Sequence, residues 1–475
     1  MRLRCLRHIW RQLSSTRRRT GPGRHDLRPR GWSLPSISRL RHSRAARSFN
    51  PRNESAVRGA GQEALMREAV IHGEKIGNAA PLNLSGRIPE LDGLRGLAIG
   101  SVLIWHYFMV PTVTAPGTPL SYALVFGRLT WSGVDLFFVL SGFLIGGILL
   151  DARKASNYFQ VFYTRRFFRI VPIYAAVLLI VPTFLLLAQR THHGTWLTPA
   201  HPPWYFFWTF TQNFWMVRAM DFGGNALGVT WSLAIEEQFY LTLPLIVRFF
   251  TGRKLWAWVL GGICMAPLAR VAIRLIWPHN WIAGFVLMPC RADALLLGVL
   301  AAILIRDDAW RDRIRSNNLF FAILMPILLI GIGFLGWKSP AFTDSIMRTF
   351  GYTWLALFYV SVLLFSVTRP NSFISRALRF KWLGWLGGIA YGTYLLHQAI
   401  VGFLFRYFWG HFPQITNALA FLTALTALAL TLVAARLSWR YFESPLIRLG
   451  HRSSYTFAEP SAKAVPRPSA EAAYP

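Results

Sequence analysis

Arg95 and His106 are the two residues whose types and spacing first point to chemistry in this sequence. They are eleven positions apart, almost three turns of an α-helix, so a helix here would carry both on one face, about 16 Å apart. A neutral histidine can act as a general base towards a hydroxyl group. An arginine can hold the phosphate groups of a substrate. A histidine that simply packs between helices is the alternative for His106.

Further ionisable residues lie in apolar segments, where a charge is costly and is therefore a candidate for function. Asp135 and Glu236 each come early in such a segment, at the depth predicted for His106. A carboxylate bonded to the histidine would fix its tautomer and stabilise its positive charge, so both are candidate catalytic residues. Alternatively, both could pair with Arg291 in a buried structural network. Other polar residues expected to line a shared cavity are Ser141, Tyr240, Arg291, Asp293 and His397.

Arg165, Arg166 and Arg169 form a basic cluster directly before an apolar segment. Guanidinium groups bind phosphates through paired hydrogen bonds, so the cluster could hold a phosphorylated substrate together with Arg95. The alternative is that these arginines are ordinary basic residues that orient a membrane protein.

The segments that must position these residues have the composition of membrane helices. The chain has 475 residues, of which 53% are hydrophobic and only 15% charged, whereas soluble proteins carry about 25% charge. Ten apolar segments are long enough to span about 30 Å of hydrocarbon. We therefore predict an all-α, polytopic membrane helix bundle of about ten transmembrane helices, near residues 91–112, 130–150, 170–189, 232–250, 255–276, 284–305, 319–337, 349–367, 386–408 and 416–437.

The charges of the loops predict the orientation of this bundle. If the N-terminus is cytoplasmic, the inner loops carry fifteen Lys and Arg residues and the outer loops five. Cytoplasmic loops of membrane proteins are enriched in Lys and Arg, so both termini are expected to be cytoplasmic. The net charge of +31 is spread over the N-terminal region and these short loops, which argues against a nucleic-acid partner.

The two ends of the chain differ from the apolar region. Residues 1–86 are rich in Arg, Ser, Gly and Pro and lack apolar periodicity, which predicts a basic, mostly disordered arm. Residues 87–447 form the expected membrane domain, and 448–475 are expected to be a disordered tail. Cys5, Cys264 and Cys290 lack metal-ligand spacing, so we expect neither a metal site nor a disulfide framework.

The longest outer loop, residues 190–231, could cover an acceptor site or could be a simple connection. It carries His192, His193 and His201 together with several Trp residues. The aromatic stretch 204–216 within it is too short to span a bilayer and is typical of an interfacial or re-entrant piece.

Seven motifs in order make the chain resemble the bacterial acyltransferase-3 family of integral membrane O-acyltransferases. The first two are RIPELDGLRGLAIGSVLIWHYF (87–108) and GVDLFFVLSGFLI (133–145), followed by RRFFRIVPIY (165–174) and WSLAIEEQFY (231–240). The last three are RADALLLG (291–298), YGTYLLH (391–397) and FESP (442–445). The resemblance covers about residues 87–447 and leaves the N-terminal arm outside.

The resemblance implies transfer of an acyl group, often acetyl, from acyl-CoA to a hydroxyl group of a cell-envelope glycan, a lipid or a small metabolite. His106 would be the catalytic histidine, and Arg95, Arg165, Arg166 and Arg169 would bind the donor. Acyl-CoA, with acetyl-CoA as the first candidate, would be a co-substrate, and no bound cofactor is expected. The lipid bilayer is a further partner, and the implied location is the bacterial inner (plasma) membrane.

A membrane transporter of an acylated or anionic solute is the rival function, because transporters also place charges within the membrane. No convincing internal repeat relates two halves of the sequence, although many transporters have one. An arginine cluster on the donor side also has no evident role in transport. Transfer from a thioester in proteoliposomes would separate the two functions.

Overall fold

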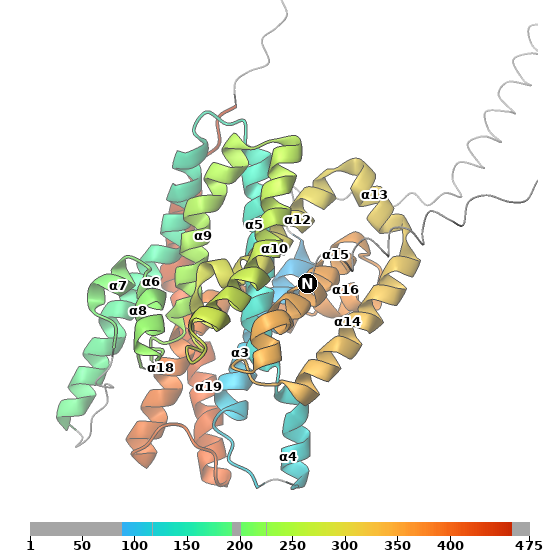
Figure 1. Ribbon diagram of the computed structural model, residues 1–475. Coiled ribbons are helices and arrows are strands. Elements are labelled where there is room, and N and C mark those ends of the chain that lie inside the picture. Colours follow the sequence, from blue (N-terminus) through green and yellow to red (C-terminus); the bar gives the residue numbers. More distant parts are fainter. Residues whose placement is uncertain (1–87, 116, 192–200, 225, 458–475) are drawn as a thin grey trace, which may run out of the picture. The chain divides into compact units, whose positions relative to one another are not determined.

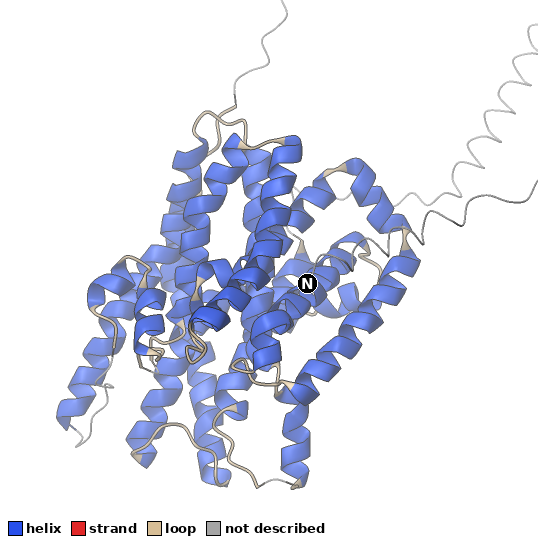
Figure 2. Cartoon of the chain, viewed as in Figure 1, coloured by secondary structure: helices blue, strands red, loops and turns tan. Residues whose placement is uncertain are grey.

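The computed structural model describes residues 88–115, 117–191, 201–224 and 226–457. The predicted N-terminal arm, His192 and His193 lie outside the described residues. The described residues form helices and turns and contain no β-strand, which confirms the all-α prediction (Figure 2).

The helices follow one another along the chain with short connections. In order they are α3 (Pro89–Ile104), a π-helical turn η1 (Trp105–Met109), α4 (Pro119–Leu124), α5 (Gly133–Ala152), α6 (Tyr158–Thr191), α7 (Trp204–Trp208), α8 (Gln212–Ala219), α9 (Thr230–Phe249), α10 (Gly252–Ile276), α11 (Ala283–Val286), α12 (Met288–Arg306), α13 (Asp308–Ser316), α14 (Asn318–Lys338), η4 (Met347–Gly351), α15 (Tyr352–Thr368), α16 (Phe373–Leu378), α17 (Lys381–Gly388), α18 (Ala390–Trp409), α19 (Ala418–Ser438), η5 (Trp439–Glu443) and α20 (Ser444–Gly450). Two short 3₁₀ turns, Val125–Gly127 and Thr130–Ser132, precede α5.

Local sequence explains where several of these helices begin and end. Asn317 and Asn417 each accept a hydrogen bond from the backbone N–H three residues later, and so cap α14 and α19. Pro89 begins α3, where its missing N–H costs nothing. Gly410 ends α18 with φ +72°, a left-handed conformation that glycine adopts without strain.

The apolar helices match the predicted spans closely. Among the described residues, seven helices are long and apolar enough to cross a membrane, or eight if α17 and α18 count as one span bent by 72°. Two of the ten predicted spans are not among these, namely α3 with η1, and α9. Both carry the polar residues on which the functional prediction rests, and these lower their mean hydropathy. The stretch 204–216 forms the short helices α7 and α8.

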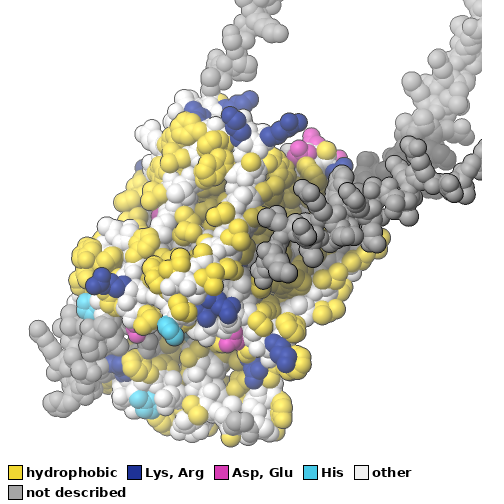
Figure 3. Space-filling view, in the orientation of Figure 1, with side chains coloured by type: hydrophobic (Ala, Val, Ile, Leu, Met, Phe, Trp, Pro, Cys, Tyr) yellow, Lys and Arg dark blue, Asp and Glu magenta, His cyan; other side chains and the backbone are white. Residues whose placement is uncertain are grey.

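The burial of the helices separates a central group from a lipid-facing group. In the membrane-spanning stretches of α5 and α12, 72% and 67% is buried within the protein. In those of α10 and α14 the buried share is only 17%. Leu275 of α10 and Ile330 of α14 are 77% and 72% exposed, as expected for side chains that face lipid tails. Figure 1 shows the long helices packed in a bundle with α14 at one side, and Figure 3 shows hydrophobic side chains over most of the visible face.

Glycines allow the central helices α5 and α12 to approach closely. A Cβ atom added at Gly142 would lie 1.8 Å from the carbonyl oxygen of Leu295, and one added at Gly298 would lie 2.1 Å from that of Val139. Small residues at such crossings let the backbones of membrane helices touch. The crossing fixes the register of α5, which carries both Asp135 and Ser141.

Replacement of Gly142 with alanine is therefore expected to destabilise the protein by about 1–3 kcal/mol, because backbone must shift to admit the methyl group. Thermal unfolding of the purified protein in detergent measures the effect. The matched control is Gly261→Ala in α10, where an added Cβ meets no atom within 4 Å. An equal fall in melting temperature for both variants would contradict the close crossing.

Candidate functional site

A cavity of about 320 Å³ is lined by residues of α3, α5, α6, α9, α17, α18, η5 and α20. Its polar lining includes Arg95 of α3, Arg166 and Arg169 of α6, and Glu236 of α9. The bend between α17 and α18 supplies Gly387 and Gly388, and α5 supplies a wall that is apolar apart from Ser141. The apolar lining from α5 is Val134, Phe137, Phe138, Leu140, Leu144, Ile145 and Ile148.

The arginine cluster is divided between two environments. Arg166 and Arg169 line the cavity, and neither forms an ion pair with a described acidic residue. The guanidinium group of Arg166 lies 5.9 Å from the centre of the Tyr240 ring. Arg165 points elsewhere and donates two hydrogen bonds, of 3.0 and 2.6 Å, to the carbonyl oxygen of Ser453. Two guanidinium groups are thus left to bind an anion in the cavity.

Arg95 has a partner on its own helix. Its Nη1 atom lies 3.2 Å from the carboxylate of Asp92, one turn earlier in α3. The ion pair leaves the other donors of this guanidinium available, and Arg95 lines the same cavity as Arg166 and Arg169. Three arginines from two helices therefore face one space, which fits a ligand with several negative charges.

Three predicted polar residues form a hydrogen-bonded chain at the side of the cavity. The hydroxyl of Tyr240 donates to Oε2 of Glu236 at 3.3 Å, and it is also hydrogen-bonded to the hydroxyl of Ser141. All three residues line the cavity. The chain fixes the Glu236 carboxylate between the tyrosine and the arginine-lined space.

His106 lies outside this lining, on the π-helical turn η1, a local distortion frequent at functional sites. Its Nδ1 atom is 3.0 Å from the carbonyl oxygen of Val102 and 3.3 Å from Nε2 of His397. A carbonyl can only accept, so Nδ1 of neutral His106 carries the proton and Nε2 keeps its lone pair free. His106 is therefore arranged to accept a proton at Nε2.

His397 has the same tautomer for the same reason. Its Nδ1 atom is 2.6 Å from the carbonyl oxygen of Tyr394 and must donate there, which leaves Nε2 as an acceptor facing His106. His397 is fully buried, and its own carbonyl accepts a hydrogen bond from Tyr107. A fixed acceptor at this position would stabilise positive charge on His106, the role that a carboxylate has in catalytic triads.

Tyr394 lines the cavity and contacts His397. Its ring centre lies 5.7 Å from that of His397. Its hydroxyl donates to the carbonyl oxygen of Val229 at 2.9 Å and is 2.6 Å from the hydroxyl of Ser232.

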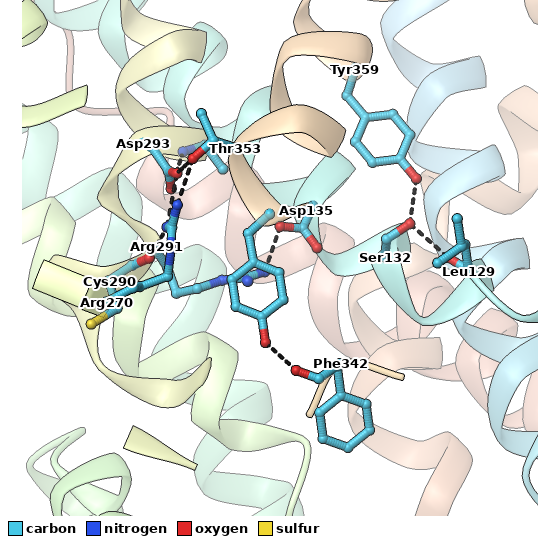
Figure 4. A network of polar contacts seen from close by, with 12 residues as sticks. Leu129, Ser132, Asp135, Arg270, Cys290, Arg291, Asp293, Phe342, Thr353 and Tyr359 are labelled. Atoms are coloured by element: carbon cyan, nitrogen blue, oxygen red, sulfur yellow. Dashed lines mark hydrogen bonds and ion pairs between the residues drawn. The ribbon is translucent and has the colours of Figure 1, made fainter. Parts of the chain in front are cut away.

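The structure does not bring Asp135 or Glu236 to His106. Asp135 forms a buried ion pair with Arg291, the arrangement that the sequence left as an alternative (Figure 4). The Arg291 guanidinium also lies 4.0 Å from the centre of the Tyr352 ring. No carboxylate of the described residues is within hydrogen-bonding distance of His106, and catalytic roles for Asp135 and Glu236 stay predictions.

A second buried pair lies beside the first in Figure 4. Nη1 of Arg270 is 2.9 Å from the carboxylate of Asp293, which also accepts a hydrogen bond of 2.6 Å from Thr353. The two pairs connect α5, α10 and α12, and the hydrogen bond from Thr353 adds α15. Arg291, Asp293 and His397, which the sequence placed in the shared cavity, are absent from its described lining.

The cavity also contains residues that the sequence analysis did not assign to it. Tyr394, Tyr391 and Glu443 lie within motifs of the family resemblance, so those motifs were the available signal. His451 lies beyond the last apolar segment, and no sequence pattern marked it. Among the described residues, no group of three His, Cys, Asp or Glu side chains could hold a metal ion.

Comparison with known proteins gives one family and several relatives. The family described as acyltransferase domain matches residues 88–436. Peptidoglycan O-acetyltransferase OatA of Listeria monocytogenes is 26% identical over 403 residues, which cover 76% of this chain and 56% of that protein. O-acetyltransferase OatA of Staphylococcus aureus is 24% identical over 381 residues, or 77% of this chain and 58% of that protein. The chain thus matches less than two thirds of the length of these relatives. No solved structure matches.

Proposed function

The chain belongs to the acyltransferase-3 family, and from this premise we propose that it transfers an acyl group from acyl-CoA to a hydroxyl group of a cell-envelope glycan. The observation that carries the proposal is the arginine-lined cavity beside a histidine whose Nε2 atom is free to accept a proton. Arginines suit a phosphorylated donor, and a free imidazole nitrogen suits a hydroxyl acceptor.

Arg95, Arg166 and Arg169 are the residues proposed to bind the donor. They would hold the phosphates of coenzyme A, while the apolar wall from α5 would face the pantetheine arm and the acyl group. Arg166 and Arg169 lie in the first half of α6, on the side that the loop charges predict to be cytoplasmic. Acyl-CoA is a cytoplasmic metabolite, so the proposed donor and the proposed orientation agree.

In the proposed transfer step, His106 takes up one proton from the acceptor and gives it to the leaving group. Nε2 of His106 takes the proton of the acceptor hydroxyl as its oxygen bonds to the thioester carbon. The carbon–sulfur bond breaks, and the departing thiolate takes the proton back. Nε2 of His397 accepts from the Nδ1–H of His106 throughout and stabilises the transient imidazolium. His106 lies outside the cavity lining, so side chains of the lining must move for the acyl group to reach it.

The acceptor is proposed from the relatives and from the chemistry of the site. The Listeria relative is named as a peptidoglycan O-acetyltransferase, so a glycan hydroxyl and an acetyl group are the first candidates, with a lipid or small-molecule hydroxyl as further acceptors. A glycan of the bacterial envelope would place the protein in the inner membrane.

Release of free thiol from acetyl-CoA by the purified protein in proteoliposomes tests the function. With envelope glycan fragments present, we expect thiol release together with acetate that stays on the glycan, identified by mass spectrometry. Movement of acetyl-CoA or another anion across the membrane, without cleavage of the thioester, would favour the transporter instead.

Replacement of Arg169 with glutamine is expected to raise the KM for acyl-CoA by about 10–100-fold, because a hydrogen bond to a charged group contributes about 1.5–3 kcal/mol. The kcat at saturating donor should change little. The matched control is Arg253→Gln, an exposed arginine at the start of α10 on the same side of the predicted bundle. Equal KM values for the two variants would remove Arg169 from the donor site.

A further inference from the structure

The last described residues of the chain pack across the start of α6. We call residues 451–457 the C-terminal strap. The backbone N–H of Ser156 donates to the carbonyl oxygen of Thr456 at 2.9 Å, and the side-chain amide of Asn157 donates to that of Ser454 at 2.9 Å. The N–H of Thr456 donates to Oδ1 of Asn157 at 2.9 Å. The described part of the predicted disordered tail is therefore held in place.

Arg165 fixes the middle of the C-terminal strap. Both of its hydrogen bonds to Ser453 come from one guanidinium group, which also lies 5.1 Å from the centre of the Tyr455 ring. The position of Arg165 within the basic cluster thus places the strap beside Arg166 and Arg169.

One helical face leads from the last long helix into the C-terminal strap and forms a wall of the cavity. Trp439, Glu443, Ile447 and His451 all line the cavity, and they follow one another at intervals of four residues. Gly450 brings this wall close to α6, because a Cβ at Gly450 would lie 2.9 Å from the Cβ of Phe168. All four lining residues lie beyond residue 436, where the family match ends.

His451 stands at the end of this face, exposed and next to the arginine cluster. Partial burial lowers the pKa of His451 below its usual value, and the positive charges of Arg165, Arg166 and Arg169 lower it further. Arg448 of α20, with Arg452 and Tyr455 of the strap, are the other titratable or charged groups nearby in the chain. A neutral imidazole that gains an anionic neighbour can donate a hydrogen bond to it and take up a proton.

We propose that His451 is a donor-binding residue, which contacts a phosphate of coenzyme A where the cavity opens, and that the C-terminal strap holds it there. This inference rests on the proposed function, because it names a further contact for the same donor. It also assigns Arg165 a role distinct from that of its neighbours. Arg165 positions the strap, whereas Arg166 and Arg169 face the ligand.

Calorimetric titration of the full-length protein in nanodiscs with free coenzyme A tests the proposal. We expect His451→Ala to weaken binding about tenfold or more, as for loss of one hydrogen bond to a charged group, and His451→Asn to retain part of the affinity. Asn157→Ala, which removes three hydrogen bonds that hold the strap, should weaken binding in the same direction. The control is His411→Ala, an exposed histidine after α18 that is absent from the cavity lining.

The response to pH and to the ligand separates a phosphate contact from a structural role. A bound phosphate would raise the lowered pKa of His451, so wild-type affinity should increase as pH falls from 8 to 6, and this increase should be smaller in His451→Ala. Pantetheine, which lacks the nucleotide phosphates, should bind both proteins equally. Melting temperatures of the variants show whether each is folded.

The outcomes of these titrations are distinct. If the wild-type protein does not bind coenzyme A, the proposed function fails. If the wild-type protein binds it and folded His451→Ala binds it equally well, the inference about His451 is overturned while the proposed function stands. An equal loss of pantetheine affinity would also overturn it, because the contact would not be with a phosphate.

Discussion

Replacement of His106 with glutamine is expected to lower the rate of acyl transfer by about two to four orders of magnitude, the usual contribution of a general base. Glutamine is polar and similar in reach, but it cannot take up the proton of the acceptor hydroxyl. Because His106 is absent from the cavity lining, the KM for acyl-CoA should change little. Initial rates in proteoliposomes at saturating donor and acceptor measure the effect.

Two further variants test whether the loss of rate is specific to His106. His397→Gln should lower the rate less than His106→Gln, because it replaces the imidazole acceptor that faces Nδ1 of His106 and leaves the free Nε2 of His106 in place. His411→Gln changes an exposed histidine and should leave the rate unchanged. Transfer at the wild-type rate by His106→Gln would remove His106 from the mechanism altogether.

The partner of His106 shows what depth in a membrane can and cannot predict. Asp135 and His397 were both expected near His106 because loop charges and hydropathy give the depth of each residue. Depth does not say which helices touch, and the face of α5 that carries Asp135 packs towards Arg291 of α12. The tight glycine crossing of α5 and α12 determines this choice, and it depends on side-chain volumes in three dimensions.

The basic cluster shows a second limit. Arg166 and Arg169 are three positions apart and Arg165 and Arg169 are four positions apart, so all three lie within about 100° of arc on the helix. Helical periodicity therefore does not show which of them faces a ligand. It cannot predict the partner of Arg165, because the carbonyl of Ser453 lies almost three hundred positions later in the chain.

The hydropathy pattern predicted the positions of most helices well. The predicted spans that mean hydropathy does not detect are those that carry the candidate functional residues. Arg95 and His106 lie on α3 with η1, and Glu236 lies on α9; these are the two predicted spans that composition alone does not identify. Polar side chains in a span weaken the signal that marks it as a span. The family motifs supply the missing information, because they record residue types that a hydropathy average removes.

Replacement of Asp135 with asparagine is expected to destabilise the protein by about 3–5 kcal/mol, because it leaves the buried charge of Arg291 without its carboxylate. The matched variant is the double replacement Asp135→Asn with Arg291→Gln, which removes both charges and should recover much of the lost stability. Thermal unfolding in detergent compares the two, and an unchanged melting temperature in the single variant would contradict a structural ion pair.

The double variant also decides between the two roles considered for Asp135. If Asp135 only secures α5 against α12, the double variant should fold and transfer acyl groups at nearly the wild-type rate per folded molecule. If Asp135 takes part in catalysis, the double variant should fold and yet be as slow as His106→Gln. The ion pair of Asp135 with Arg291 favours the first result, since His106 already has a buried acceptor at Nδ1 and needs no carboxylate there.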